Sequence, residues 1–452
     1  MTKNKNRVFF ISLLFLLAVT VFTLTFIPRN SVKADYVYTQ TTDGIALSEI
    51  NAVSGSVLEI PASIDGKTVV EIKSGAVKNL KDVTSVTVPN TVTKIGRGAF
   101  TGLKYLESIT LPFVGGSSNS VGAESSFGYI FGNNVNTGDY TLQNYSETES
   151  SVFYIPYKLK IVEITGGTLG YGAFSNCVSI ETVKLGGGIT EVPDYAFKGA
   201  IALTTVTLPE TVTTIGEKAF YNTAVENINL GKIKSFGKMS FANTKLNSLT
   251  LTDAEIIGEK AFSGNAKLAV VALGENLTAI GDYAFSYLSL LKTVDLPNGL
   301  TSVGKGVFYQ NTRLTSVNAN GIAFVSEDGV LYSKDKTELI VYPAMKTGTE
   351  FSIPDSVTKV YENAFNGNKF LKTLSVGTNI TEIGYSAFSQ MPSLKTLNLK
   401  FNGGSANATG ERAQNGYLFG ELPFEGCKVE NVNVDGVDKF YCLPLNLTIS
   451  VA

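Results

Sequence analysis

The chain has 452 residues, of which 44% are hydrophobic and 17% charged, so it has enough apolar side chains for a folded core. Its formal net charge is −2, and residues 35–452, with 32 basic and 39 acidic side chains, carry −7, which argues against nucleic acid as a partner. The absence of histidine excludes Ser-His-Asp and Cys-His catalysis and histidine-ligated zinc.

Residues 1–34 have the parts of a secretory signal peptide. A basic start, from Lys3 to Arg7, precedes a mainly apolar run over 8–27 and a small-residue site that ends at Ala34. We expect cleavage after Ala34, so that the mature chain begins at Asp35. The apolar run is also long enough to cross a bilayer, which leaves an uncleaved anchor as the alternative. In both cases the rest of the chain is expected to be secreted or exposed at the cell surface.

Residues 35–76 carry short alternating segments separated by turn signals. Asp43-Gly44 and Asp65-Gly66 are typical of hairpin turns between such segments. A stack of repeats needs an end that covers its open apolar face. This stretch is therefore predicted to be an N-terminal β-hairpin cap.

From residue 77 onwards the chain repeats with a period of about 23 residues. Most repeats end in an Ala-Phe pair, and Val77 is a degenerate first member of the series. Self-similarity at a fixed period of this length is the signature of a solenoid. The phenylalanines are Phe100, Phe174, Phe197, Phe220, Phe241, Phe262, Phe285, Phe308, Phe365 and Phe388.

One repeat, residues 198–220, shows what each unit contains. Val206 and Leu208 alternate with threonines, which predicts a strand with one apolar face, and the proline that follows ends it. Val212 and Ile215 form a second inward segment. Gly216 then turns the chain into Ala219-Phe220, which is predicted to be a short helical turn.

A single unit cannot fold alone. Its roughly seven buried side chains contribute about 10 to 20 kcal/mol, against an ordering cost of about 1 to 2 kcal/mol for each residue. Stacked units share their apolar faces and pair their strands. The predicted fold is a β-rich solenoid of leucine-rich repeats over 77–452, forming a curved right-handed superhelix with one concave parallel sheet.

Three insertions interrupt the repeat. Those at about 113–160 and 401–445 are predicted to be copies of one β module, because both place Gly-Gly-Ser, Gly-Tyr-x-Phe-Gly and Phe-Tyr at nearly the same spacing. The insertion at about 320–350 is predicted to be a β-hairpin with its turn at Asp328-Gly329. The second module lacks the closing repeat that follows the first, so we expect the native array to continue beyond residue 452.

The repeat pattern resembles a known family. The spacing L-x-x-V-x-L-P-x-x-V-T-x-I-G-x-x-A-F at 203–220 is similar to that of the BspA-like leucine-rich-repeat family of bacterial surface proteins, and the resemblance extends over 35–452. It implies an exported or wall-exposed protein whose repeats bind other macromolecules, often host matrix or plasma proteins. The family supplies no common binding residues to carry over.

Little in the sequence indicates catalysis. The acidic residues are scattered over turns of different repeats, so paired-carboxylate hydrolysis is disfavoured, and we expect no enzyme activity, metal or cofactor. Cys177 and Cys427 each follow a phenylalanine, Phe174 and Phe424, by three residues and are predicted to fill the core. A Cys427–Cys442 bridge is the alternative for that pair.

The outward strand positions of 182–318 are the candidate binding surface. They are small, hydroxyl-rich and nearly uncharged, and the predicted partner is an extracellular protein of the matrix or plasma type or a glycan, bound by a monomer. A polysaccharide-binding or structural wall module is the alternative function. The preference of threonine for exposed strands explains the pattern equally well without any function. The candidate residues are Thr182, Lys184, Thr205, Thr207, Asn227, Asn229, Ser248, Thr250, Thr293, Asp295, Ser316 and Asn318.

Overall fold

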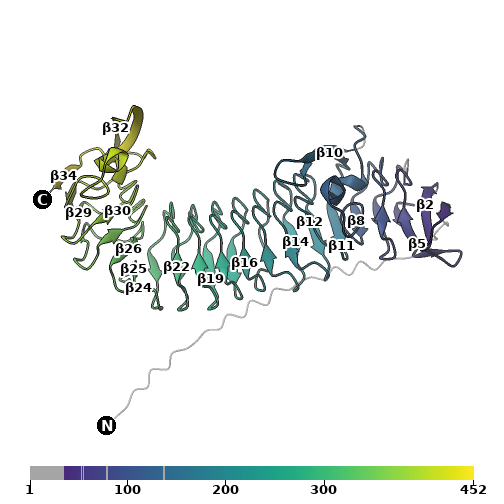
Figure 1. Ribbon diagram of the computed structural model, residues 1–452, viewed down its shortest axis with the longest axis horizontal. Helices are drawn as coiled ribbons and strands as arrows, with labels where there is room; N and C mark the ends of the chain where they lie inside the picture. Colours follow the sequence, from purple (N-terminus) through teal and green to yellow (C-terminus); the bar gives the residue numbers. More distant parts are fainter. Residues whose placement is uncertain (1–34, 52, 54, 78–79, 136–137, 452) are drawn as a thin grey trace, which may run out of the picture.

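The computed structural model describes residues 35–51, 53, 55–77, 80–135 and 138–451. The predicted signal peptide and its cleavage site after Ala34 fall outside this part. The described chain winds into an elongated stack of coils, which confirms the predicted leucine-rich-repeat solenoid (Figure 1). Within that part, no helix has the length and hydrophobicity of a membrane span.

Each regular coil contributes one strand to a parallel ladder, called the first ladder below. Its inward side chains are buried and its outward ones alternate with them. The ladder consists of successive hydrogen-bonded parallel sheets. Its strands are β3 (Val57–Glu59), β6 (Ser85–Thr87), β8 (Ser108–Leu111), β11 (Ile161–Ile164), β12 (Thr182–Leu185), β14 (Thr205–Thr207), β17 (Ser248–Leu251), β19 (Val270–Leu273), β21 (Thr293–Asp295), β23 (Ser316–Asn318), β27 (Glu350–Ser352), β29 (Thr373–Ser375), β31 (Thr396–Leu399) and β34 (Thr448–Val451).

A second parallel ladder runs beside the first, so the prediction of a single parallel sheet was incomplete. Most of its strands are two residues long, too short for their alternation to be recognised from sequence. They are β5 (Lys67–Ile72), β7 (Lys94–Ile95), β13 (Glu191–Val192), β15 (Thr214–Ile215), β16 (Ser235–Phe236), β18 (Ile256–Ile257), β20 (Ala279–Ile280), β22 (Ser302–Val303), β26 (Glu338–Val341), β28 (Lys359–Val360) and β30 (Glu382–Ile383).

The Ala-Phe segment closes each coil as a turn, called the aromatic turn below. The expected helical turn is absent, because the residues two before and two after the phenylalanine are left-handed, as at Tyr195 (φ 61°) and Gly199 (φ 73°). This backbone points N–H groups at the next coil. The N–H groups of Tyr195, Phe197 and Gly199 donate to the carbonyls of the following aromatic turn at 2.8, 2.7 and 2.9 Å.

The phenylalanines of these turns stack along the solenoid. From Phe174 to Phe308 successive ring centroids lie 5.2, 5.1, 4.7, 5.7, 5.6 and 6.1 Å apart, with interplanar angles between 6° and 19°. The rings are buried. Each ring therefore contacts the coil before it and the coil after it. In this way neighbouring coils cover one another's apolar interiors.

The N-terminal stretch combines hairpins with the first coil. Strands β1 (Tyr36–Gln40) and β2 (Ile45–Ile50) are antiparallel, as are β4 (Ser63–Ile64) and β5. However, β3 pairs with β6 and β5 pairs with β7, both in parallel. Both ladders thus begin before residue 77, inside the segment expected to be only a cap.

The two inserted modules share one order of elements. The first has the short 3-10 helices η1 (Gly122–Ser125) and η2 (Phe127–Ile130) and the hairpin β9 (Asp139–Asn144) to β10 (Ser150–Ile155). In both modules the second 3-10 helix continues the row of aromatic turns, since Phe100 N–H donates to Ile130 at 2.9 Å and Phe388 N–H donates to Leu418 at 2.8 Å. The second module consists of η3 (Gly410–Ala413), η4 (Asn415–Leu418), β32 (Cys427–Val434) and β33 (Val437–Pro444).

The solenoid bends at the third insertion. The predicted hairpin is present there as β24 (Phe324–Glu327) and β25 (Val330–Ser333), with its turn at Asp328 and Gly329. It adds residues beside β23, on the strand side of the coil.

Aromatic turns that are not consecutive meet on the opposite side of this bend. The hydroxyl of Tyr283 donates to Glu362, and the amide of Gln310 donates to Gln390, across 79 and 80 residues of sequence. The inside of the bend is therefore the edge that carries the aromatic turns (Figure 1).

Replacing Phe220 by alanine should be strongly destabilising. The ring is fully buried between Phe197 and Phe241, at 5.1 and 4.7 Å, so its loss leaves a cavity shared by two coil interfaces. We expect a cost of about 3 to 5 kcal/mol in urea denaturation. The exposed control Thr207→Ala should change the midpoint little, and equal midpoints for both variants would show that the stack does not hold the coils.

Gly306→Ala should loosen the bend. A Cβ at this left-handed residue (φ 54°) would meet the ring of Tyr283 at 2.5 Å and push it away from Glu362. We expect a loss of about 1 to 3 kcal/mol. At the control position Gly187, nothing lies within 4 Å of the added Cβ, so Gly187→Ala should be nearly neutral. A Gly306→Ala variant as stable as Gly187→Ala would contradict this account.

Candidate functional site

The predicted candidate residues lie together on the outward face of the first ladder. Parallel pairing holds them in register, with Thr182 opposite Thr205 and Lys184 opposite Thr207. An isolated bridge joins Thr205 to Asn227, whose coil has no regular strand in the first ladder. Ten of the twelve side chains are exposed, while Thr182 and Ser316 are half-buried. Alternation along the strands therefore places the candidate residues as the sequence predicted.

The two charged members of this face have polar partners on neighbouring strands. The ammonium of Lys184 lies 2.6 Å from the carboxylate of Glu163, and Asp295 accepts a hydrogen bond from the amide of Asn318 at 2.7 Å. Exposed pairs of this kind contribute little to stability. The Lys184–Glu163 pair is neutral overall, whereas Asp295 keeps its negative charge because its partner is an amide.

The sequence missed some members of the face, among them Ile161 and Glu163. Both belong to β11, which pairs with β8 and β12 although it follows the first inserted module. The apolar-polar alternation of residues 161–164 would have identified the strand. Ile161 and Val270 are 51% and 59% exposed, so the face also carries apolar side chains that a ligand could cover.

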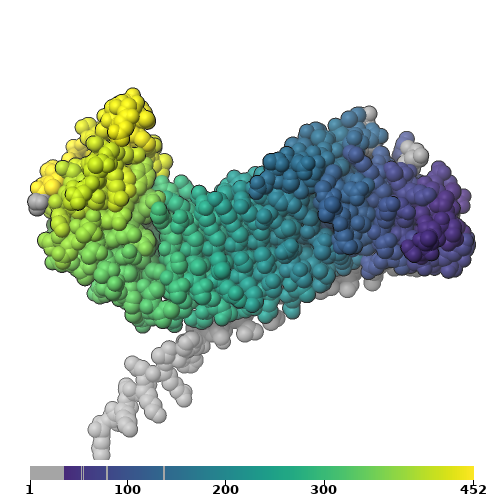
Figure 2. Space-filling view, viewed as in Figure 1, coloured from purple at the N-terminus to yellow at the C-terminus, as the bar shows by residue number. Residues whose placement is uncertain are grey.

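The outward face of the first ladder is not the hollowed side of the molecule, which corrects the prediction of a concave sheet. Figure 2 shows the hollow on the opposite edge, between the inserted modules, and the contacts of Tyr283 and Gln310 place the inside of the bend there too. The reason is the hairpin β24–β25, which adds residues on the strand side. The modules 113–160 and 401–445 consequently flank the aromatic turns.

An open groove of about 570 Å³ lies on this edge, and we call it the turn-edge hollow. It is formed by residues that follow the phenylalanines of four consecutive coils. A second cavity, of about 20 Å³ at the bend beside Phe308 and Tyr342, is too small for any ligand larger than water. The turn-edge hollow is lined by Asn243, Ser263, Gly264, Ala266, Tyr287, Ser289, Gln310 and Thr312.

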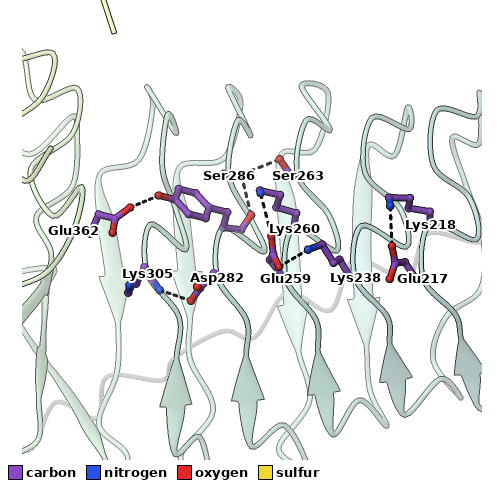
Figure 3. Close-up of polar contacts among 11 residues, drawn as sticks. Glu217, Lys218, Lys238, Glu259, Lys260, Ser263, Asp282, Ser286, Lys305 and Glu362 are labelled. Atoms are coloured by element: carbon purple, nitrogen blue, oxygen red, sulfur yellow. Dashed lines mark hydrogen bonds and ion pairs between the residues drawn. The ribbon is translucent and has the colours of Figure 1, made fainter. Parts of the chain in front are cut away.

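A row of paired charges runs along the side of these turns (Figure 3). Glu259 accepts from Lys238 at 2.8 Å and from Lys260 at 3.0 Å, and these hydrogen bonds hold the pKa of Glu259 below its usual value. The carboxylate of Asp282 accepts from the backbone N–H of Lys305 at 2.9 Å. These contacts tie successive coils together, with two lysines sharing the single carboxylate of Glu259.

No metal centre emerges among residues 35–451 outside the gaps named above: that part has no group of three Cys, Asp or Glu side chains able to hold a metal ion. Cys177 is buried as predicted, and burial raises the pKa of its thiol. The prediction for Cys427 was wrong, because Phe419, not Phe424, is the buried ring of its module. Cys427 is half-buried on β32, and both it and Cys442 are free thiols.

The sequence did not indicate the turn-edge hollow, because its lining residues are ordinary turn residues in composition. The one available signal was the recurrence of large side chains, such as Tyr287 and Gln310, two positions after the phenylalanine where glycine or asparagine is favoured. Which edge is hollowed depends on the bend, and local spacing carries no information about that.

Comparison with protein families gives one match. The BspA type leucine-rich repeat region matches residues 70–168, 167–254, 234–347 and 341–409, which together span most of the chain. Comparison with curated proteins gives no match.

Among solved structures, the chain is similar to several bacterial proteins. A leucine-rich repeat protein from Eubacterium ventriosum is 25% identical over 57% of this chain and 72% of its own, with a TM-score of 0.40. A leucine-rich cell surface protein from Faecalibacterium prausnitzii is 21% identical, covering 81% and 76%, with a TM-score of 0.33. A leucine-rich repeat protein from Bacteroides ovatus is 19% identical, covering 83% and 88%, with a TM-score of 0.45.

A bulky charged side chain should be tolerated at an outward position of the first ladder but not at the adjacent inward position. Thr205 is exposed and Val206 is 4% exposed, so Thr205→Arg should change the free energy of unfolding by less than about 0.5 kcal/mol. Val206→Arg should cost several times more, because it forces a charge into the core. Urea denaturation measures the free energy of unfolding of the two variants. Comparable losses would mean that the side chain of Thr205 is packed against the protein and is not exposed.

Proposed function

Because the chain belongs to the family of BspA type leucine-rich repeat proteins, we propose that it is an exported surface protein, without catalytic activity, that binds an extracellular protein through the outward face of the first ladder. The signal-peptide pattern of residues 1–34 supports export. The observation that carries the binding role is the exposed, register-paired row of side chains from Thr182 to Asn318, since the inward positions alone account for the fold.

The size of the face fits a protein ligand. Parallel strands lie about 4.8 Å apart, so the coils from β12 to β23 extend about 30 Å, and a strand length of about 10 Å gives an area of about 300 Å². A standard interface covers about 800 Å² on each partner. A ligand with this footprint would therefore extend over β11, β8, β6 and β3, which continue the sheet of β12 and β14, and onto residues beside the strands.

Exposed apolar side chains would supply the centre of the contact. Val270 lies on β19 with Ala272, between strands whose outward residues are hydroxyls and the carboxylate of Asp295. Interfaces place apolar contacts at their core and polar residues at the rim. Threonine and asparagine would then form the hydrogen-bonding margin. Steering by charge would be weak, because the candidate residues include only two charged side chains, Lys184 and Asp295, of opposite sign.

A binding screen tests the proposal. The purified protein would be passed over immobilised matrix and plasma proteins by surface plasmon resonance. For a protein that binds, the combined variant Thr205→Arg, Asn229→Lys and Thr293→Glu should lower affinity at least about tenfold, because a large charged side chain blocks each of three coils. Raising the salt concentration from 0.1 to 0.5 M should change affinity little.

A matched control places similar charges beside the second ladder. Thr190→Glu, Thr278→Arg and Ser302→Lys are exposed substitutions there and should leave affinity unchanged. Loss of binding in the control alone would contradict the proposed face. Binding that survives the first variant but is abolished by Tyr140→Ala on β9 would place the site on the inserted module instead.

A further inference from the structure

The turn-edge hollow has the lining of a site for a polar, uncharged ligand. Its eight lining residues include no Asp, Glu, Lys or Arg. They include instead a tyrosine ring, two amides and three aliphatic hydroxyls. The small residues Gly264 and Ala266 leave space in the groove. Its volume of about 570 Å³ lies within the range of small-ligand pockets, and its open ends allow a longer chain to pass through.

The ring of Tyr287 is fixed as an exposed platform. It is 48% exposed, and the ring of Tyr309 holds it edge to face at 5.4 Å and 87°. The left-handed backbone of Tyr287 (φ 59°) sets the direction of its side chain. A rigid aromatic face that remains accessible to solvent is suited to stacking against a flat ligand with C–H groups on one side.

Two polar groups of the hollow are free to bind a ligand. Among the described residues, neither the side-chain amide of Asn243 nor the hydroxyl of Thr312 makes a hydrogen bond. The lining residues recur on coils 241, 262, 285 and 308, whose rings lie 5.7, 5.6 and 6.1 Å apart. This step is comparable with the advance of one sugar residue along an extended glycan chain.

We infer that the turn-edge hollow binds a neutral glycan chain, with a sugar ring stacked on Tyr287 and sugar hydroxyls bonded to Asn243 and Thr312. Each sugar carries several hydroxyls that both donate and accept, so it can satisfy closely spaced amides and hydroxyls that an apolar ligand would leave unpaired. An anionic glycan needs uncompensated cations. Lys238 and Lys260 beside the hollow share the single carboxylate of Glu259, and neither belongs to the lining of the hollow (Figure 3).

This site goes beyond the proposed function, because it lies on the opposite edge from the first ladder and takes a different class of ligand. A chain lying along the hollow would run between the two module hairpins, β9–β10 and β32–β33, which flank it (Figure 2). A protein bound to the first ladder and a glycan bound in the hollow would not compete for the same residues.

Isothermal titration calorimetry of the purified protein tests the inference with neutral hexasaccharides: β-1,4-glucan, β-1,3-glucan, chitin and mannan fragments. At least one should bind, with an affinity that is unchanged between 0.1 and 0.5 M salt. Tyr287→Ala should weaken that binding about tenfold or more, whereas Tyr287→Phe keeps the ring and should retain most of it. Thr312→Val, which removes only a hydroxyl, should weaken it by a smaller factor.

Two controls keep the test decisive. Tyr105 is 50% exposed and lies outside the hollow, so Tyr105→Ala should bind as the unchanged protein does. If Tyr287→Ala folds poorly, Ala266→Arg provides a second block, because Ala266 is exposed and its new side chain fills the groove without touching the core. The ladder variant Thr205→Arg, Asn229→Lys and Thr293→Glu should leave glycan binding intact.

Three results would overturn the inference. They are the absence of binding by every neutral hexasaccharide, glycan binding that survives both Tyr287→Ala and Ala266→Arg, and binding only by a charged probe such as heparin in a salt-dependent way. A loss of protein binding in Tyr287→Ala, without any glycan binding, would assign the hollow to the protein interface instead. The first three results do not depend on whether the first ladder binds a protein, so the two proposals can fail separately.

Discussion

The structure depends on the fact that a coil cannot satisfy its own backbone or its own core. Hydrogen bonds from Phe197 to Ala219, and their equivalents along the chain, join each aromatic turn to the next. The phenylalanine rings stack at the same step, 4.7 to 6.1 Å from Phe174 to Phe308. Because both interactions run between coils, their repetition fixes the direction of growth, and the outward side chains are left free to vary.

That constraint explains how the molecule accommodates insertions. The hairpin β24–β25 enlarges one coil on its strand side, yet it supplies Leu331 to the core before the bend and Tyr332 to the core after it. The stack of apolar side chains is thus carried through the bend. On the other side, Gly306 leaves room for the Tyr283 ring to reach Glu362. The bend follows because residues are added on the strand side while space is left at the aromatic turns. The edge that carries the aromatic turns is therefore hollowed.

The result is a solenoid with two chemically distinct exposed surfaces. The outward face of the first ladder is flat, with hydroxyls, amides and scattered apolar side chains such as Val270. The turn-edge hollow presents the ring of Tyr287 among uncharged polar groups. Charged side chains are few on the first surface, where Lys184 and Asp295 are the charged candidates, and none belongs to the lining of the second. Shape and short-range hydrogen bonding are what each surface can use for selection.

The sequence by itself determined the repeat, the inward residues and the outward face, because alternation in strands such as Thr205–Thr207 and the spacing of the phenylalanines are local properties. It also identified the hairpin turn at Asp328-Gly329, since only a few residue pairs suit such a turn. Only the tertiary structure decided that the short segments form a second ladder, that Phe419 replaces Phe424 in the core, and that the hollow lies on the aromatic turns. These features depend on contacts between coils 20 to 80 residues apart, as between Tyr283 and Glu362, and no local pattern of residues encodes them.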